Sequence, residues 1–342
     1  MDSRLSRFRE DDEKNAECGL RFHLCGVCKV RPKALVCGAA GFIGSHMVDR
    51  LLLEGYSVFG IDDLSSGRLE NLENALKSSE FEMRVHDITS PLEIVGNLEL
   101  VINFASLASP PRYLADPIHT LRSGSIGSEN LLRLANLKDA RYVFISTSEV
   151  YGDPLVHPQP ETYWGNVNPI GIRSCYDEAK RYGEAITSAF RRVYQLDTGI
   201  LRVFNTYGPR LRLDDGRVIS NFLQQASKGG PLTVYGSGSQ TRSFCFITDL
   251  IEGIWRFSMS THSGPMNLGN DNEVTVLEVA ESMSLIFGIP LEVSHLVLPE
   301  DDPRRRKPDI GLARSVLNWT PTVSLEDGIR CTIKSFQENG GI

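Results

Sequence analysis

The sequence lacks the features typical of membrane, secreted and nucleic-acid-binding proteins. None of its apolar runs approaches the roughly 18 residues needed to span a bilayer. The N-terminal stretch MDSRLSRFREDDEKNAE has no apolar signal-peptide core. Lysine and arginine total 36 against 43 acidic residues, and the net charge of -7 offers no general basic surface. We therefore expect a cytoplasmic protein with neither nucleic acid nor membrane as a partner.

Cysteine is also too sparse for a disulfide scaffold, because only seven are spread over 342 residues. The one cluster is Cys18, His23, Cys25 and Cys28, from which a zinc knuckle could be drawn. No second C-x-x-C or H-x-x-x-H follows it, and the segment precedes the first core strand. We expect an incidental pair in a mobile tail and no metal site.

What the chain does contain, from Lys33 onward, is an alternation of short apolar runs and amphipathic stretches. ALVCG, SVFGID, LVINFA and RYVFIST read as strands, and FIGSHMVDRLLLEG and IGSENLLRLANL read as helices. This alternation predicts an α/β fold, a Rossmann-type doubly wound parallel sheet covered on both faces. After about residue 210 it loosens into a smaller C-terminal α/β lobe. The expected parts are a tail (1–31), a Rossmann domain (32–207), to which segments near 243–268 can return, and the lobe (208–342).

The stretch CGAAGFIG indicates a dinucleotide site. It sets Gly38, Gly41 and Gly44 in the spacing G-x-x-G-x-x-G between a strand and a helix, where backbone can approach a pyrophosphate at the helix N-terminus. Asp62 follows 24 residues after Gly38 and can accept hydrogen bonds from a ribose 2′-OH. This favours NAD over NADP, although Arg68 could pair with a 2′-phosphate.

The stretches STSEVYG and YDEAK indicate a hydride-transfer site. Tyr176 and Lys180 are four residues apart on an expected helix and so share one face. A neighbouring ammonium and a positive nicotinamide ring favour the phenolate of a tyrosine whose ordinary pKa is about 10. Thr147, at the end of an expected strand, can hydrogen-bond the same substrate oxygen.

These segments, with RVFNTYGPR and YGSGSQTRSF, resemble the extended short-chain dehydrogenases/reductases that act on nucleotide sugars. SEVYGDPLVHPQPETYWGNVNPIG, DDGRVISNF, LTVYGSGSQTR and DDPRRRKPDI resemble the UDP-glucuronate decarboxylase (UDP-xylose synthase) subgroup in particular. The likeness covers about residues 33–336. One departure is Arg122-Ser123-Gly124, where close relatives usually carry Lys-Thr-Asn.

The resemblance implies a reaction. The sugar is oxidised at C4, CO2 leaves the 4-keto intermediate, and the returned hydride gives UDP-xylose with NAD recycled. Ser148 beside Glu149 is the decarboxylase pattern, because an aspartate at that place would repel the substrate carboxylate whereas a hydroxyl can bond to it. The resemblance also implies that Glu149 and Arg306 flank the carboxylate and C5. Arg306 would bind the carboxylate, for which a planar guanidinium is suited, or help to deliver the C5 proton through water. The implied catalytic residues are Thr147, Ser148, Glu149, Tyr176, Lys180 and Arg306.

The binding residues that the resemblance implies form two sets, and it also implies a homodimer with UDP-glucuronate as substrate. The expected NAD site consists of Gly38, Gly41, Phe42, Ile43, Gly44, Asp62, Asp63, Ser66, Gly67, Asp87, Ile88, Phe104, Ala105, Ser106, Ser123, Tyr176 and Lys180. The expected substrate site consists of Arg122, Asn130, Asn205, Arg217, Tyr235, Gln240 and Arg242.

Other interpretations stay open. A nucleotide-sugar 4,6-dehydratase or 4-epimerase shares most of these motifs, and Ser148 with the RRRKPD segment argues against both. A bifunctional apiose- and xylose-forming enzyme shares the decarboxylation step. A non-catalytic NAD-binding regulator or an RNA-binding relative is a different class, and the intact Thr147, Tyr176 and Lys180 argue against it.

Overall fold

The computed structural model describes residues 31–290, 292–297 and 305–338. Residues 1–30 of the predicted tail, with the cluster of Cys18, His23, Cys25 and Cys28, lie outside this part of the chain. Within the described residues, no helix is long and apolar enough to cross a membrane.

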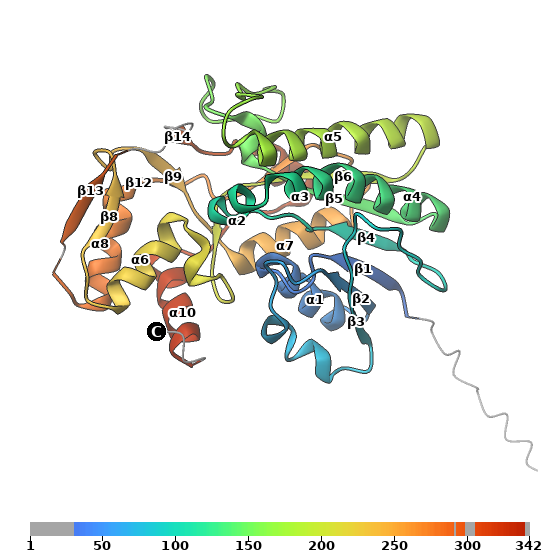
Figure 1. Ribbon diagram of the computed structural model, residues 1–342, viewed down its shortest axis with the longest axis horizontal. Helices are drawn as coiled ribbons and strands as arrows, with labels where there is room; N and C mark the ends of the chain where they lie inside the picture. The colour runs from blue at the N-terminus through green and yellow to red at the C-terminus, as the bar shows by residue number, and fades with distance from the viewer. Residues whose placement is uncertain (1–30, 291, 298–304, 339–342) are drawn as a thin grey trace, which may run out of the picture. The chain divides into compact units, whose positions relative to one another are not determined.

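A seven-stranded sheet, parallel throughout, organises the chain (Figure 1). Its apolar, β-branched strands are nearly all buried, which is typical of a parallel sheet covered on both faces. The predicted Rossmann-type α/β fold is therefore confirmed. In spatial order the strands are β11 (Met266–Leu268), β6 (Thr198–Val203), β5 (Arg141–Thr147), β4 (Leu100–Asn103), β1 (Lys33–Cys37), β2 (Ser57–Asp62) and β3 (Phe81–Val85).

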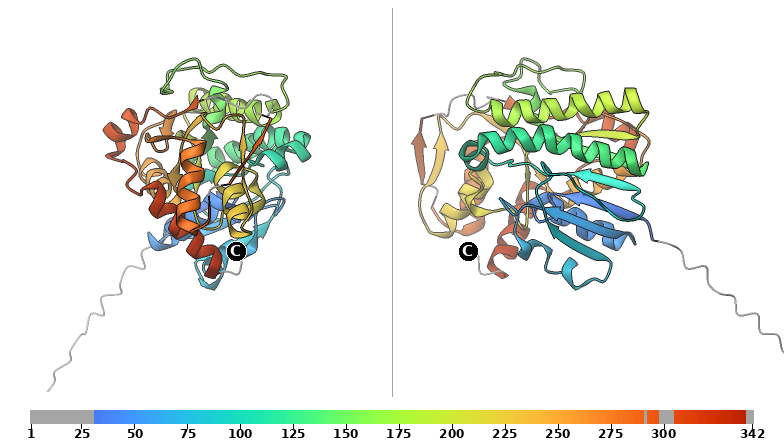
Figure 2. Two further views of the ribbon diagram at one scale, coloured as in Figure 1. Left: turned by 90° about the vertical axis from the view of Figure 1, so that its left-hand side faces the viewer. Right: turned by 45° about the vertical axis from the view of Figure 1, so that its right-hand side comes forward.

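Side-chain alternation along the strands builds two core layers. Ala34 and Val36 pack into the layer under α1 (Phe42–Leu53) and α7 (Ile247–Ser258). Leu35 and Cys37 face the opposite layer, under α4 (Ser128–Lys138) and α5 (Ser174–Tyr194). The right-hand view of Figure 2 shows α4 and α5 lying side by side across this second face.

The helix that leads into α4 is not uniform. After α2 (Pro110–Ala115), α3 (Pro117–Arg122) passes into a π-helical segment, Ser123–Gly127, and then into α4. A β-carbon at Gly124 would lie 2.6 Å from the Ala179 β-carbon on α5. Glycine at this place therefore permits a close approach of the two helices.

The C-terminal part carries small sheets and its own helices. β8 (Leu232–Tyr235) pairs with β13 (Val293–Leu296), and β7 (Thr206–Tyr207) pairs with β10 (Cys245–Phe246). A third sheet has the order β12 (Glu273–Thr275), β9 (Thr241–Ser243), β14 (Arg305–Arg306). The helices are α6 (Val218–Ser227), α8 (Val276–Phe287), α9 (Gly311–Leu317) and α10 (Leu325–Glu338).

The chain does not leave the main sheet for good at residue 207. α7 packs against β6 and α1, and β11 forms an edge of the seven-stranded sheet. Residues 247–268 thus pack with the main sheet. The boundary between 207 and 208 stays a prediction.

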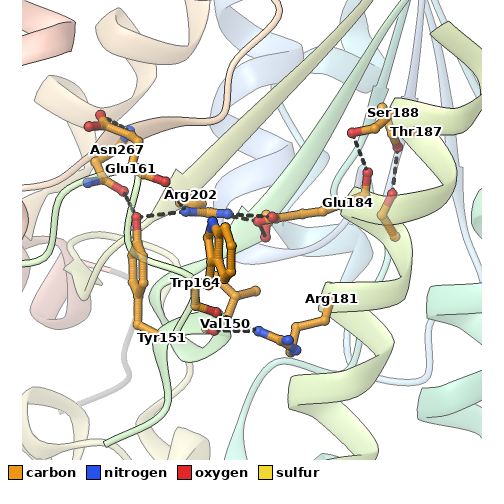
Figure 3. Close-up of polar contacts among 12 residues, drawn as sticks. Val150, Tyr151, Glu161, Trp164, Arg181, Glu184, Thr187, Ser188, Arg202 and Asn267 are labelled. Carbon is orange, nitrogen blue, oxygen red and sulfur yellow. Dashed lines mark hydrogen bonds and ion pairs between the residues drawn. The ribbon is translucent and has the colours of Figure 1, made fainter. Parts of the chain in front are cut away.

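A buried polar network fixes the chain after β5 (Figure 3). The Arg202 guanidinium donates to both carboxylate oxygens of Glu184, at 2.8 and 2.7 Å, and to the Tyr151 hydroxyl at 2.9 Å. Tyr151 in turn donates to Asn267 at 2.8 Å. Arg202 therefore joins β6 to α5 and to the turn after β5, and Tyr151 extends the network to β11. This turn begins at the STSEVYG segment.

Replacement of Glu184 by glutamine should destabilise the fold, because it leaves the Arg202 charge buried beside a neutral amide. We expect the free energy of unfolding to fall by about 3–5 kcal/mol, measured by urea denaturation. Glu326→Gln is the matched control, since it removes an exposed i,i+4 partner of Arg330 on α10 and should cost less than about 0.5 kcal/mol. Equal losses in the two variants would contradict this role.

Candidate active site

The site lies at the carboxyl ends of the sheet strands, where ligands bind in open α/β folds. A cavity of about 750 Å³ is lined by the β1–α1 turn, the ends of β4, β5 and β6, and residues of the C-terminal part. A smaller hollow of about 60 Å³ continues it past Gly38 and Gly41 to the ends of β2 and β3. An elongated ligand can therefore run from Asp62 to the residues after β5.

The glycine turn fits a pyrophosphate. Gly38 has a positive φ of 77°, and a β-carbon there would lie 2.9 Å from the Ala105 backbone nitrogen. A β-carbon at Gly44 would collide with the Gly38 carbonyl oxygen. Helix α1 begins at Phe42, and its N-cap, Gly41, provides no side-chain hydrogen bond to the first turn. The amides of this turn are thus arranged for an anion rather than for a capping side chain.

At the other end of the hollow, Asp62 is held firmly. Its carboxylate accepts hydrogen bonds from the amides of Ala40 and Leu64, both at 2.9 Å. Burial raises the pKa of Asp62, which these amides partly offset. Gly67 approaches so closely that a β-carbon there would lie 2.6 Å from the carboxylate. Beside it, the His119 ring lies 3.1 Å from the Asp63 carboxylate, a contact that sequence reasoning did not predict.

The structure brings the expected cofactor residues together. All of them except Gly67 line the cavity or the hollow, and Gly67 contributes through Asp62. Asp87, expected near the adenine, uses its carboxylate to accept hydrogen bonds from the amide and hydroxyl of Thr89. Arg68, the possible partner of a 2′-phosphate, is exposed and lies outside both linings.

Thr147, Tyr176 and Lys180 also meet at the cavity. Thr147 ends β5, and its hydroxyl acts on Tyr176 in the direction that favours the phenolate. Lys180 donates to the Ile145 carbonyl at 2.8 Å, and its Nζ lies 6.0 Å from the centre of the Tyr176 ring. Burial raises the pKa of Tyr176 to about 12 and lowers that of Lys180 to about 8. In the protein itself, burial therefore outweighs the lowering of the Tyr176 pKa that the sequence suggested.

Glu149 lies between two guanidinium groups. Arg306 donates to both of its carboxylate oxygens, the second at 2.9 Å, and Arg173 donates to the same oxygen at 2.8 Å. Burial by itself would raise the pKa of Glu149, but Arg306 and Arg173 bring it down to about 2. The two guanidinium groups therefore favour the ionised form of Glu149. The sequence placed Glu149 and Arg306 on the same part of a substrate, and the structure pairs them.

Three residues of this region were missed by sequence reasoning. Arg173 stands at the N-cap of α5, three residues before Tyr176, and this spacing could have suggested it. Tyr113 on α2 stacks on Tyr176 with ring centres 5.2 Å apart and planes at 8°. Asp177 is buried directly after Tyr176. No local pattern marks Tyr113, because its proximity to Tyr176 arises from the packing of α2 on α5. Asp177 is adjacent to Tyr176 in the chain, but its burial cannot be read from that position.

The expected substrate residues divide into two groups. Five line the cavity, namely Asn205, Arg217, Tyr235, Gln240 and Arg242. Arg122 is exposed at the end of α3, and Asn130 on α4 donates to the Ile88 carbonyl at 2.9 Å. The helix directions turn both of them away from the cavity lining, so the structure does not bring them to the other substrate residues.

The charge of the lining selects anions. It contains seven arginines and Lys180 but only two acidic residues, Glu149 and Asp215, in a protein whose net charge is -7. Several of these arginines are oriented in advance by acids of the protein, as Arg217 is by Asp215. Such an arrangement suits a ligand that carries phosphate and carboxylate groups.

The fold and this cavity define a Rossmann-type protein that holds a dinucleotide beside a second, anionic ligand. The model of the NAD dependent epimerase/dehydratase family matches residues 34–269, and the chain belongs to that family.

The chain is similar to named members of this family. It is 47% identical over 306 residues to UDP-glucuronic acid decarboxylase 2 of Arabidopsis thaliana, covering 90% of this chain and 68% of that one. It is 45% identical over 310 residues to UDP-glucuronic acid decarboxylase 1 of Xenopus tropicalis, covering 91% and 73%. The structure superposes with a TM-score of 0.81 and 27% identity on UDP-glucuronic acid 4-epimerase from Bacillus cereus in complex with UDP-glucuronic acid and NAD, covering 90% and 99%.

The ion pairs of Glu149 make a pH-dependent contribution to stability. Its pKa in the folded protein lies below the ordinary value of 4.5, so the contribution is complete above that pH and is lost as the pH falls toward about 2. Glu149→Gln should therefore lower the free energy of unfolding by roughly 1–3 kcal/mol at pH 7, and by less at pH 3. Urea denaturation at both pH values measures this, and a difference that does not change with pH would contradict it.

Proposed function

We propose that this protein is a UDP-glucuronate decarboxylase that forms UDP-xylose and CO2 with recycled NAD. The observation that carries the proposal is the pairing of Glu149 with Arg306 and Arg173 directly beside Thr147, Tyr176 and Lys180. An oxidation site and a carboxylate-binding site then act on one sugar ring. The similarity to named UDP-glucuronic acid decarboxylases over nine-tenths of the chain supports the same activity.

NAD fits the glycine turn and the hollow at Asp62, and when bound it supplies a reversible hydride acceptor for the sugar C4. Gly38, Gly44 and the first turn of α1 would hold its pyrophosphate, and Asp62 and Asp63 its adenosine ribose. Two adjacent carboxylates would repel a 2′-phosphate, which favours NAD over NADP.

Tyr176 removes the proton of the C4 hydroxyl as C4 is oxidised. Thr147 would orient the shared oxygen, since it lines the same cavity as Tyr176. Lys180 is held against the Ile145 carbonyl, from where its ammonium stabilises the phenolate. Tyr113 stacks on the Tyr176 ring and limits its rotation.

The 4-ketone lies β to the C6 carboxylate, so loss of CO2 leaves the electron pair on an enolate oxygen that Thr147 and Tyr176 stabilise. Before this step, Arg306 and Arg173 hold the C6 carboxylate, with the Ser148 hydroxyl beside it. Glu149 lies against both guanidinium groups and takes part in the proton transfer to C5.

The other end of the cavity takes the nucleotide. Arg217 and Arg242 would bind the diphosphate and ribose, and Asn205 lies between them and the sugar. Tyr235 and Gln240 face the nucleotide from the region of β8 and β9, where Gln240 also donates to the Tyr235 carbonyl at 2.7 Å.

A homodimer in the cytoplasm completes the proposal. Ile118, Leu121 and Ile126 leave apolar side chains exposed on the α3–α4 helix, and Tyr182 does so on the neighbouring α5. A second copy that presents the same two helices would cover this surface.

A product assay tests the activity. Incubation of the protein with UDP-glucuronate and NAD should give UDP-xylose and CO2 within roughly minutes. NMR identifies the product, and absorbance at 340 nm should show no accumulation of NADH. A 4-epimer that retains C6, or a dehydrated sugar, would replace the decarboxylase by the 4-epimerase or 4,6-dehydratase. Persistent NADH with a 4-keto product would indicate an oxidase that releases its intermediate.

The role of the glycine turn is tested with Gly44→Ala. The added methyl group collides with the Gly38 carbonyl, so α1 must move away from the turn, and we expect NAD affinity to fall at least about tenfold. Isothermal titration with NAD measures this directly. Gly230→Ala is the control, because its β-carbon would meet nothing nearer than 3.8 Å. Equal affinity of Gly44→Ala and Gly230→Ala would contradict the assignment of this turn.

A further inference from the structure

Gln159 is a fully buried glutamine in the loop that follows β5 and the turn carrying Glu149. The residue is 0% exposed, although glutamine mostly lies at protein surfaces. Its amide nitrogen donates to the Val156 carbonyl at 2.9 Å, and its amide oxygen accepts from the Lys307 backbone amide at 2.9 Å. An apolar side chain would fill the same space without needing such partners. The amide of Gln159 therefore serves something other than packing.

The segment that Gln159 contacts directly follows Arg306. The Gln159 backbone amide donates to the Lys307 carbonyl, and the Asp309 amide donates to the Gln159 carbonyl, both at 2.9 Å. Together with the side-chain contact, these bonds hold the peptide groups on both sides of the Lys307 Cα. The first of these peptide groups is also the one that joins Arg306 to Lys307. Gln159 therefore fixes the direction of the backbone at Arg306.

Arg306 depends on such support because its own strand is short. β14 consists of Arg305 and Arg306, which pair with Thr241 and Arg242 of β9. Arg306 is 4% exposed, and both of its terminal nitrogens donate to Glu149. A bidentate guanidinium tolerates little rotation, since its donors lie in one plane. A change in backbone direction at Arg306 would therefore move the guanidinium away from any carboxylate that it binds.

The loop of Gln159 is itself anchored to the main sheet. Asn267 of β11 is 0% exposed, and it donates to the Gln159 carbonyl at 2.9 Å and to the Asp309 carbonyl at 3.0 Å. Asn267 also accepts a hydrogen bond from Tyr151 in the network of Figure 3. The position of Arg306 therefore depends, through Gln159, on the network that also fixes the turn after β5.

We propose that Gln159 is a positioning residue for Arg306, and that this contact gives the cavity its selectivity for a sugar carboxylate. The inference rests on the proposed function, because it takes the C6 carboxylate as the ligand of Arg306. Gln159 does not itself line the cavity, so it acts through Arg306. Binding of a nucleotide sugar that carries the carboxylate therefore depends on Gln159, whereas binding of the same nucleotide sugar without it does not.

The test compares the affinities of UDP-glucuronate and of UDP-glucose, which carries a hydroxymethyl group in place of the carboxylate. Isothermal titration of the protein saturated with NADH measures both without turnover, because the reduced cofactor cannot accept a hydride. The wild type should prefer UDP-glucuronate. Gln159→Met keeps the size of the side chain but removes its amide, and Gln159→Asn shortens the side chain so that its amide no longer reaches Lys307. Each variant should weaken UDP-glucuronate about tenfold and UDP-glucose less than about twofold, whereas a general loss of stability would weaken both alike.

Arg306→Gln shows whether Gln159 acts through Arg306. It should remove most of the preference for UDP-glucuronate, and in its background Gln159→Met should leave the ratio of the two affinities unchanged. Gln225→Met is the matched control. Gln225 also accepts from a backbone amide, that of Thr233 at 2.9 Å, and it donates to the Thr233 hydroxyl at 2.8 Å. Its replacement should keep the wild-type ratio.

Three results overturn the role of Gln159. They are a wild-type ratio of affinities in Gln159→Met and Gln159→Asn, a further loss of the ratio when Gln159→Met is added to Arg306→Gln, and a wild type that binds both sugars equally. The proposed function fails separately, if the wild type forms no UDP-xylose in the product assay. The ratio of affinities in the presence of NADH does not require turnover, so the two failures are distinguishable.

Discussion

The pairing of Glu149 with Arg306 and Arg173 is the interaction on which the site depends. A carboxylate in a largely enclosed cavity is tolerated only with charged partners that also satisfy its hydrogen-bonding capacity, and three donated bonds meet that condition. The partners come from β14 and from the start of α5, while Glu149 follows β5. The ends of the main sheet and the small C-terminal sheet are thereby held in register around the cavity.

A second buried ion pair, between Arg202 and Glu184, lies outside the cavity lining. Arg202 is buried in β6 and satisfied by Glu184 and Tyr151, so the segment that carries Thr147 and Glu149 is fixed from both sides. Apolar packing would stabilise this region equally well, but it would not set the direction of the chain after β5. A bidentate guanidinium does, because its donors lie in one plane and accept few geometries. The positions of Thr147 and Glu149 therefore depend on Arg202, which does not itself line the cavity.

The sequence predicted what depends on local spacing. The glycine turn, the end of β5 and the four-residue spacing of Tyr176 and Lys180 are properties of short segments, and the structure brings them to one cavity. The contact between Glu149 and Arg306 joins residues 157 apart in the chain, so spacing could not reveal it. The family resemblance implied that both residues flank the substrate carboxylate, and the structure adds that they pair with each other. The stacking of Tyr113 on Tyr176 became visible only with the packing of α2 on α5. The pKa of Tyr176 in the protein without cofactor is set mainly by burial, which cannot be read from neighbours in the sequence.

Charge arrangement explains how an acidic protein can bind a trianionic substrate without a large electrostatic cost. The arginines of the cavity are oriented before any ligand arrives, since Arg212 is held by Asp214, Arg217 by Asp215 and Arg306 by Glu149. A phosphate that binds to Arg212 or Arg217 joins an ion pair that the protein has already formed. The pair of Arg306 and Glu149 is different. A substrate carboxylate that binds there must share the guanidinium groups of Arg306 and Arg173 with Glu149. Two carboxylates that compete for the same cations raise the proton affinity of the acids around them.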